Sequence, residues 1–203
     1  STDYGFSIVS YTGTGSAATI GHGLTNQTPK FIIVKDRDGS SVNWRVYHAS
    51  TGNGKALFLS SNEAAGTSTT YWNDTSPTTS LFSVGTDTGV NSSGNDNIAY
   101  VWSEVSGYSK FGTFTHSTDT SLDFGFKPRF WLVKETDGTT PWHIFDAERD
   151  NFDDPLYPNN SNAEGSGFVF TFSGTGVSWV SGSFAPGTYI YAAFADRPGN
   201  NWD

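Results

Sequence analysis

The sequence predicts an all-β fold of antiparallel β-sandwiches, built from two diverged internal repeats of about 100 residues. Two observations lead to this prediction: the composition, and three blocks of sequence that recur in the same order. The 203 residues include 23 Gly, and 16% are aromatic but only 15% are charged, against about 25% charged residues in typical domains. Residues that favour strands and turns therefore dominate, while helix-forming residues are scarce.

Three blocks of the first half return in the second half. The most similar pair is KFIIVKD and RFWLVKE, and an Asp-Gly turn follows each. The paired blocks are 30–36 with 129–135, 44–49 with 142–147, and 97–104 with 189–196. Three collinear matches predict a duplication, with residues 1–106 as the first repeat and 107–203 as the second. Because the junction is only a few residues long, we expect both repeats to pack together as one body.

Short runs of β-favouring residues predict roughly 12 to 16 strands in total. The clearest are 6–11, 30–35, 44–48, 56–59, 81–85 and 98–104, then 111–115, 130–134, 142–145, 168–172, 177–180 and 189–194. Segment 30–35 is apolar throughout, so both of its faces should be covered. Tyr71-Trp72 is expected to begin a strand or an aromatic corner, and the one helical turn is expected around Glu63-Ala64-Ala65.

The charge balance excludes some classes of partner. Eleven basic and 20 acidic residues give a net charge of −9. Nucleic acids and anionic membranes are polyanions, so we expect no nucleic-acid partner. No apolar run approaches the roughly 18 residues that span a bilayer, so we also expect no membrane insertion. The chain has no Cys, which excludes a disulfide framework and thiol chemistry.

No motif indicates catalysis, so the protein is expected not to be an enzyme. Neither GxSxG nor HExxH occurs, and His48 and His143 have no histidine at the matching position of the other repeat. A glycosidase with two carboxylates distant in sequence stays open, with Asp146, Glu148 and Glu104 as its acids. Turn and rim acids are the favoured interpretation of these residues.

The densest acidic segment is 146–154, and it predicts either a solvated loop or a Ca²⁺ site. Its candidate ligands are Asp146, Glu148, Asp150, Asp153 and Asp154. Ca²⁺ binds oxygen-rich loops of this kind. However, the spacing lacks the central Gly and the final Glu of an EF-hand. We favour the solvated loop, keep Ca²⁺ as the alternative and expect no other cofactor.

Aromatic side chains give the strongest functional signal, because flat rings stack on the faces of sugars. Tyr71, Trp72 and Trp131 are the candidate ligand-binding residues. Tyr71-Trp72 has no match in the other repeat, and neighbouring side chains on a strand point to opposite faces, so one of the two should be exposed. Trp131 should either cover another surface or be exposed. Trp44 and Trp142 occupy equivalent positions, which favours a structural role.

Several segments carry a family resemblance that extends from about residue 5 to residue 198. They are 21–24 (GHGL), 29–35, 44–50, 105–112 (VSGYSKFG) and the end segment YIYAAFA at 189–195. These segments resemble a β-rich domain of unassigned function from bacteriophage virion proteins, often tail-fibre-like proteins of marine and cyanobacterial phages. Family members usually have a Gly-Asn-Gly turn where this chain has 116–119 (HSTD).

The resemblance implies a location on the extracellular surface of a virion and carries no catalytic residues. It implies other virion chains as partners and, because such fibres are generally trimeric, a homotrimer. We therefore expect a non-catalytic appendage module that adheres to a host-surface glycan or contacts a neighbouring virion protein. The alternative is an extracellular carbohydrate-binding module of a larger secreted protein. That alternative predicts a stacked line of exposed aromatic rings on one sheet face.

Overall fold

The computed structural model confirms a nearly all-β chain, with 43% of residues in strands and 5% in helices. It describes residues 2–39, 41–117, 120–149, 152, 154–180 and 184–196. The chain divides into two compact units, Ser1–Glu104 (unit 1) and Val105–Asp203 (unit 2), so the boundary falls two residues before the predicted one. In the described residues, no helix is long and apolar enough to cross a membrane.

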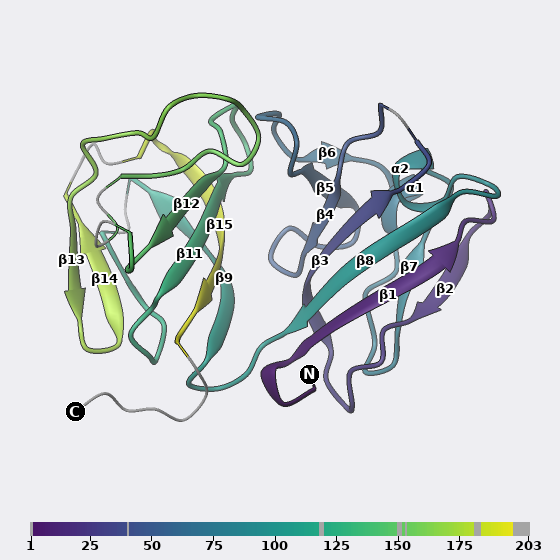
Figure 1. Ribbon diagram of the computed structural model, residues 1–203, viewed down its shortest axis with the longest axis horizontal. Helices are drawn as coiled ribbons and strands as arrows, with labels where there is room; N and C mark the ends of the chain where they lie inside the picture. The colour runs from purple at the N-terminus through teal and green to yellow at the C-terminus, as the bar shows by residue number, and fades with distance from the viewer. Residues whose placement is uncertain are drawn as a thin grey trace. The chain divides into compact units, whose positions relative to one another are not determined.

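Unit 1 is a sandwich of a six-stranded and a two-stranded antiparallel sheet (Figure 1). The large sheet has the order β1-β8-β3-β4-β5-β6, and β2 pairs with β7 in the small one. The elements are η1 (Thr2–Tyr4), β1 (Phe6–Thr12), β2 (Ala18–Gly21), β3 (Pro29–Asp36), β4 (Arg45–His48), β5 (Lys55–Phe58), β6 (Gly66–Thr67), α1 (Thr69–Trp72), β7 (Leu81–Val84), α2 (Thr88–Asn91) and β8 (Asp96–Ser103).

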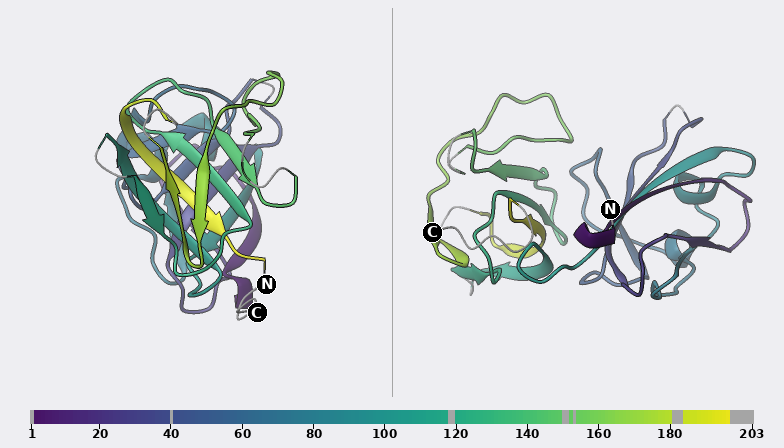
Figure 2. Two further views of the ribbon diagram at one scale, coloured as in Figure 1. Left: turned by 90° about the vertical axis from the view of Figure 1, so that its left-hand side faces the viewer. Right: turned by 60° about the horizontal axis from the view of Figure 1, so that its bottom comes forward.

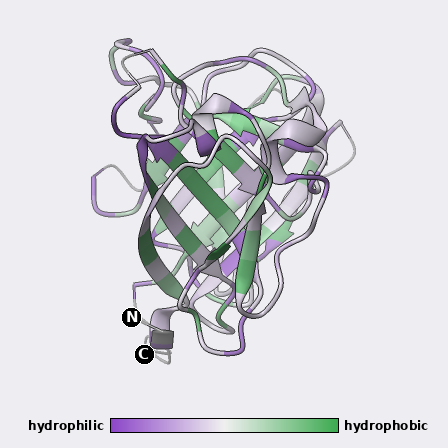
Figure 3. Cartoon of the chain, turned by 90° about the vertical axis from the view of Figure 1, so that its right-hand side faces the viewer, coloured by the Kyte–Doolittle hydropathy of each residue, from purple (hydrophilic) through white to green (hydrophobic). Residues whose placement is uncertain are grey.

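The core of unit 1 lies between these two sheets. Alternate residues of β3 and β8, such as Ile32 and Val101, point into it from the large sheet, and Phe82 of β7 closes it from the small one. Trp72 and Val90 bring the two short helices into the same core. The central four residues of β3, 31–34, are all buried, which confirms that both faces of this apolar strand are covered. In Figure 3 the hydrophobic residues concentrate in the strands and the hydrophilic ones in the loops.

Unit 2 is a second sandwich, made of a four-stranded and a three-stranded sheet (Figure 2). The orders are β12-β11-β15-β9 and β10-β14-β13. The strands are β9 (Ser109–His116), β10 (Ser121–Asp123), β11 (Phe130–Glu135), β12 (His143–Asp146), β13 (Phe170–Ser173), β14 (Gly176–Trp179) and β15 (Gly187–Phe194). Its core is strongly aromatic and contains Trp131, Phe145 and Tyr189.

Four neighbouring strands of the larger sheet have the same order in the two units. The run β1-β8-β3-β4 corresponds to β9-β15-β11-β12, and every neighbouring pair is antiparallel. Even a polar detail recurs: the Nζ of Lys35 donates to the carbonyl of Asp36 at 2.7 Å, and the Nζ of Lys134 donates to that of Glu135 at 2.6 Å. The predicted repeat requires this common order. The duplication itself, and the packing of both units as one body, stay predictions.

The short helices differ from what the sequence predicted. Tyr71-Trp72 ends α1, where the Ser68 hydroxyl caps the start by accepting from the Thr70 amide at 3.1 Å. Asn73 then adopts the left-handed conformation with φ of 51° and ends the helix, which Asn tolerates better than most residues. The expected helical turn around Glu63-Ala64-Ala65 is wrong, because these residues are irregular. Helices this short leave almost no periodicity to detect.

Candidate functional site

A row of aromatic rings crosses one face of the large sheet of unit 1. The row consists of Phe6 on β1, Tyr100 and Trp102 on β8, and Trp44 directly before β4; we call these four residues the aromatic row. Ring centroids are 4.8 Å apart for Phe6–Trp102, 6.4 Å for Tyr100–Trp102 and 6.3 Å for Trp44–Tyr100. The Tyr100 plane lies within 24° of the Trp102 plane and within 17° of the Trp44 plane.

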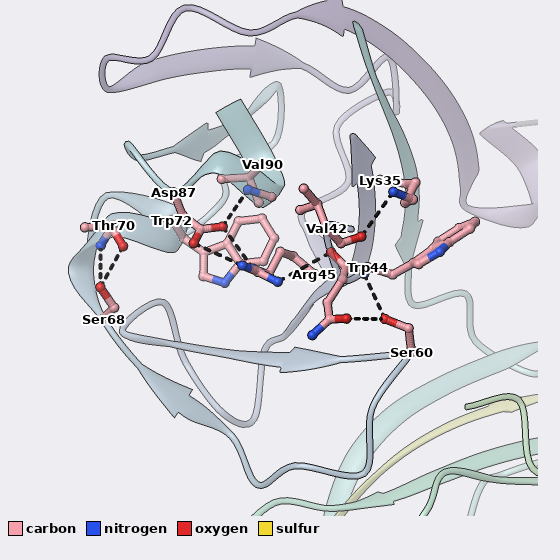
Figure 4. Close-up of polar contacts among 12 residues, drawn as sticks. Lys35, Val42, Trp44, Arg45, Ser60, Ser68, Thr70, Trp72, Asp87 and Val90 are labelled. Atoms are coloured by element: carbon pink, nitrogen blue, oxygen red, sulfur yellow. Dashed lines mark hydrogen bonds and ion pairs between the residues drawn. The ribbon is translucent and has the colours of Figure 1, made fainter. Parts of the chain in front are cut away.

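The row follows from strict alternation along β8. Ala99 and Val101 point into the core, so Tyr100 and Trp102 must point out of the opposite face of the sheet. The register sets Phe6 opposite Trp102, which places it on that same face. The backbone amide of Trp44 donates to the Ser60 hydroxyl at 3.2 Å, and this bond fixes the start of β4 (Figure 4).

The four rings of the row are partly exposed. Ile8, which pairs with Tyr100 across β1 and β8, is 55% exposed on the same face. Farther along the sheet, Val46 and His48 of β4 share this face and are buried. The more open part of the face is therefore its β1–β8 side, where Phe6, Tyr100 and Trp102 of the row lie.

The sequence favours a structural role for Trp44 and does not single out Tyr100 or Trp102 as site residues. One signal could have found the row: the large aromatic residues of 99–102 alternate with Ala99 and Val101, which are small enough to face a packed sheet.

A second cluster lies on the other face of β4, around an ion pair between that strand and the start of α2. We call Arg45, Phe58, Tyr71 and Asp87 the Tyr71 corner. Arg45 Nε donates to Asp87 Oδ1 at 2.9 Å and Arg45 Nη2 donates to Oδ2 at 3.1 Å (Figure 4). The guanidinium carbon lies 4.9 Å from the Phe58 ring centroid and 5.7 Å from that of Tyr71. Cation–π attraction therefore supports the ion pair.

Tyr71 is the one predicted ligand-binding residue whose ring is partly exposed. Burial raises the pKa of its hydroxyl; the carboxylates of Asp87 and Glu63 raise it as well, while Arg45 lowers it. Within the part of the chain that the structure describes, no group forms a hydrogen bond with the Tyr71 hydroxyl. The hydroxyl is therefore neutral at physiological pH and open to a ligand.

The two predicted ligand-binding tryptophans are buried, so the more exposed ring of the Tyr71-Trp72 pair is Tyr71, and Trp131 takes the first of its two alternatives and covers another surface. Trp72 is 1% exposed, and its indole Nε1 donates to the Lys55 carbonyl at 2.8 Å. Trp131 is 0% exposed in the core of unit 2. Trp72 and Tyr71 do diverge, but around a helix end and not across a strand. Trp131 faces opposite to its strand neighbours, as expected, and that direction leads into the core.

Arginine side chains contact the described acidic residues of segment 146–154. Arg149 Nε donates to Asp146 Oδ2 at 3.1 Å, and the same guanidinium contacts Glu164 and the Asp154 carbonyl. Arg129 pairs with Glu148. Among the described residues no group of three or more potential ligands could hold a metal ion. Asp150 and Asp153 lie outside the described residues, so Ca²⁺ binding there stays a prediction.

Comparison with known proteins places the chain in a family but assigns no activity. Residues 1–198 match the family described as a domain of unknown function (DUF7483). None of the curated proteins and none of the solved structures matches the chain significantly.

Proposed function

The chain belongs to this family of unknown function, and we propose that it is a non-catalytic adhesion module that binds a host-surface glycan through the aromatic row. The observation that supports this proposal is the line of partly exposed rings on one sheet face, Trp44, Tyr100, Trp102 and Phe6. Large rings provide contact area and lose little conformational entropy on binding, because their few side-chain torsions are already fixed by packing.

The chemistry of the row fits a sugar polymer. The apolar C–H face of a sugar ring stacks on an aromatic plane, and successive rings along a strand can contact successive sugar residues. Exposed apolar patches on a folded surface generally mark binding sites. The net charge of −9 opposes the other common use of aromatic rows, stacking on nucleic-acid bases.

For the biological setting we propose an external virion appendage, with other virion chains as partners and a homotrimer as the assembly. This part of the proposal is supported by the sequence resemblance to phage virion proteins. The aromatic row equally favours the second candidate, an extracellular carbohydrate-binding module of a larger secreted protein. Antibodies against the domain distinguish the two settings. They should label intact phage particles if the domain is part of an appendage, and only the culture medium if it is secreted.

Glycan binding is tested by screening the full chain on a glycan array and then measuring affinities of variants for the best array ligand. We expect Trp102→Ala and Tyr100→Ala each to weaken binding at least tenfold, equivalent to about 1.4 kcal/mol. Tyr100→Phe keeps the ring and should retain most of the affinity. Val169→Ala, at an exposed apolar position of unit 2, is the matched control. The proposal would be contradicted if no glycan on the array bound the chain, or if all variants had equal affinities.

A further inference from the structure

The Tyr71 corner has hydrogen-bonding groups that the fold does not use. A guanidinium has five N–H donors. In the described part of the chain, Arg45 uses three of them, two to Asp87 and one from Nη1 to the Asn43 carbonyl at 3.4 Å. Two N–H groups therefore remain on a guanidinium whose carbon lies 5.7 Å from the Tyr71 ring centroid, and the Tyr71 hydroxyl has no partner among the described residues. The Arg45 donors and the Tyr71 hydroxyl, which can both donate and accept, thus belong to one aromatic-lined corner.

From these groups we propose that the Tyr71 corner is a second binding site, and that its ligand is a neutral, hydroxyl-bearing group such as an uncharged sugar residue. The corner is distinct from the aromatic row, because Arg45 follows Trp44 in sequence and their side chains point to opposite faces of the sheet. Sugar hydroxyls can accept from Arg45 and exchange hydrogen bonds with Tyr71. The Tyr71 ring is partly exposed and adds an aromatic surface to the corner.

The charge of the corner disfavours ionised ligands. Asp87 binds the Arg45 guanidinium through both carboxylate oxygens, so the pair carries no net charge. A second carboxylate, Glu63, is close enough to affect Tyr71. An acidic ligand would meet Asp87 and Glu63, while a cationic ligand would meet Arg45. A neutral polar ligand avoids both repulsions and still finds the open donors.

Because Gly66 has no side chain, it leaves room for the Tyr71 hydroxyl. A Cβ at position 66 would lie 2.9 Å from Tyr71 Oη and 3.2 Å from Phe58 Cζ. These contacts are closer than side chains normally allow, so any residue other than Gly would displace the ring. Gly66 does not have a positive φ, so Gly66→Ala should move Tyr71 without straining the backbone. This substitution therefore changes the geometry of the corner and leaves its chemistry intact.

The test uses the full chain carrying Trp102→Ala, which weakens binding at the aromatic row. The neutral probes are hexasaccharides of glucose, mannose, galactose and N-acetylglucosamine, each titrated to millimolar concentration; hexagalacturonate is the acidic probe. We expect one neutral probe to bind. Adding Tyr71→Phe, which removes only the hydroxyl, or Gly66→Ala should weaken its binding about threefold to tenfold, as one hydrogen bond predicts.

Several outcomes would overturn the second site. These are the absence of neutral-probe binding, tighter binding of hexagalacturonate than of every neutral probe, or affinities that Tyr71→Phe and Gly66→Ala leave unchanged. Failure of the corner is distinguishable from failure of the aromatic row. If the aromatic row is not a binding site, Trp102→Ala should leave the wild-type affinity unchanged. If the Tyr71 corner is not a binding site, Tyr71→Phe should leave the affinity of the Trp102→Ala chain unchanged.

Discussion

At the scale of single residues, Trp131 is a large, fully buried side chain of the core of unit 2. Its indole is fully buried and lies 5.4 to 6.3 Å from six other rings. Trp131→Ala should lower the free energy of unfolding by about 3 to 5 kcal/mol. Trp131→Phe should cost much less, because the indole Nε1 is buried with no partner in the described part of the chain. Urea unfolding measures both, and equal losses would contradict this account.

His143 should make unit 2 sensitive to acid. Its ring is 7% exposed and packs against Phe145, Tyr157, Phe168 and Phe184. Burial lowers its pKa to about 4, and the Lys134 ammonium lowers it as well, against a backbone hydrogen bond with Pro141. Because the folded pKa lies below the unfolded value of 6.5, the unfolded state binds the additional proton. Stability should therefore fall as the pH drops from about 6.5 toward 4.

This acid sensitivity can be measured by comparing the wild type with His143→Phe. Between pH 8 and pH 4.5 the histidine should account for about 2.5 kcal/mol of lost stability. Urea unfolding at the two pH values should show that His143→Phe loses less stability than the wild type by this amount. Identical losses would mean that other groups set the acid response.

Tyr71 and Trp72 show what sequence could establish at this scale and what it could not. Their neighbouring positions predicted one exposed and one buried ring, and this is what the structure has. The choice between them depended on α1, whose four residues are too short to leave a helical pattern. The exposure of Trp131 could not be predicted from the sequence, because its strand is apolar on both sides. The direction of a ring on such a strand does not say which side reaches solvent.

At the scale of elements, the Arg45–Asp87 pair ties β4 to α2. Asp87 also caps α2 by accepting from the Gly89 amide at 2.9 Å. The two side chains are 13% and 16% exposed, so solvent screens the pair only partly. Asp87→Asn should destabilise the protein by about 2 kcal/mol, since it weakens charged hydrogen bonds and leaves Arg45 without its counter-ion. Urea unfolding of this variant measures the loss.

A double-mutant cycle with Arg45→Met separates the ion pair from the cap. Coupling above about 1 kcal/mol is expected, as for contacting charged groups. The cap should account for the remaining loss in Asp87→Asn. Additive effects of the two substitutions would show that the pair contributes nothing beyond its separate contacts.

The elements that sequence predicted well are the long strands with a clear pattern. Strands 30–35, 98–104 and 189–194 match β3, β8 and β15 to within two residues at either end. Strand β2 (Ala18–Gly21) was not predicted, because its alternation covers only four residues between Gly- and Ser-rich turns. The aromatic row was missed for a different reason. The aromatic row depends on the register of three strands, and no single segment of the sequence contains that information.

At the scale of the whole molecule, the two units share a strand order but not the aromatic row. In unit 2 the positions that match Tyr100, Trp102 and Phe6 by register are Ala192, Phe194 and Ser109. Trp142, which matches Trp44, is 1% exposed. A ligand of the aromatic row should therefore bind once per chain. Calorimetric titration of a Tyr71→Ala chain measures this stoichiometry, and two equivalent sites per chain would contradict it.

The most direct test of the central claim follows the indole N–H signals of the seven tryptophans by NMR during titration with the glycan that binds best. Trp44 and Trp102 belong to the row, whereas Trp72, Trp131, Trp142 and Trp179 are buried. Individual Trp→Phe substitutions assign the signals. The account predicts that glycan binding shifts the signals of Trp44 and Trp102 and leaves those of the four buried tryptophans in place. Binding that leaves both row signals unmoved would contradict it.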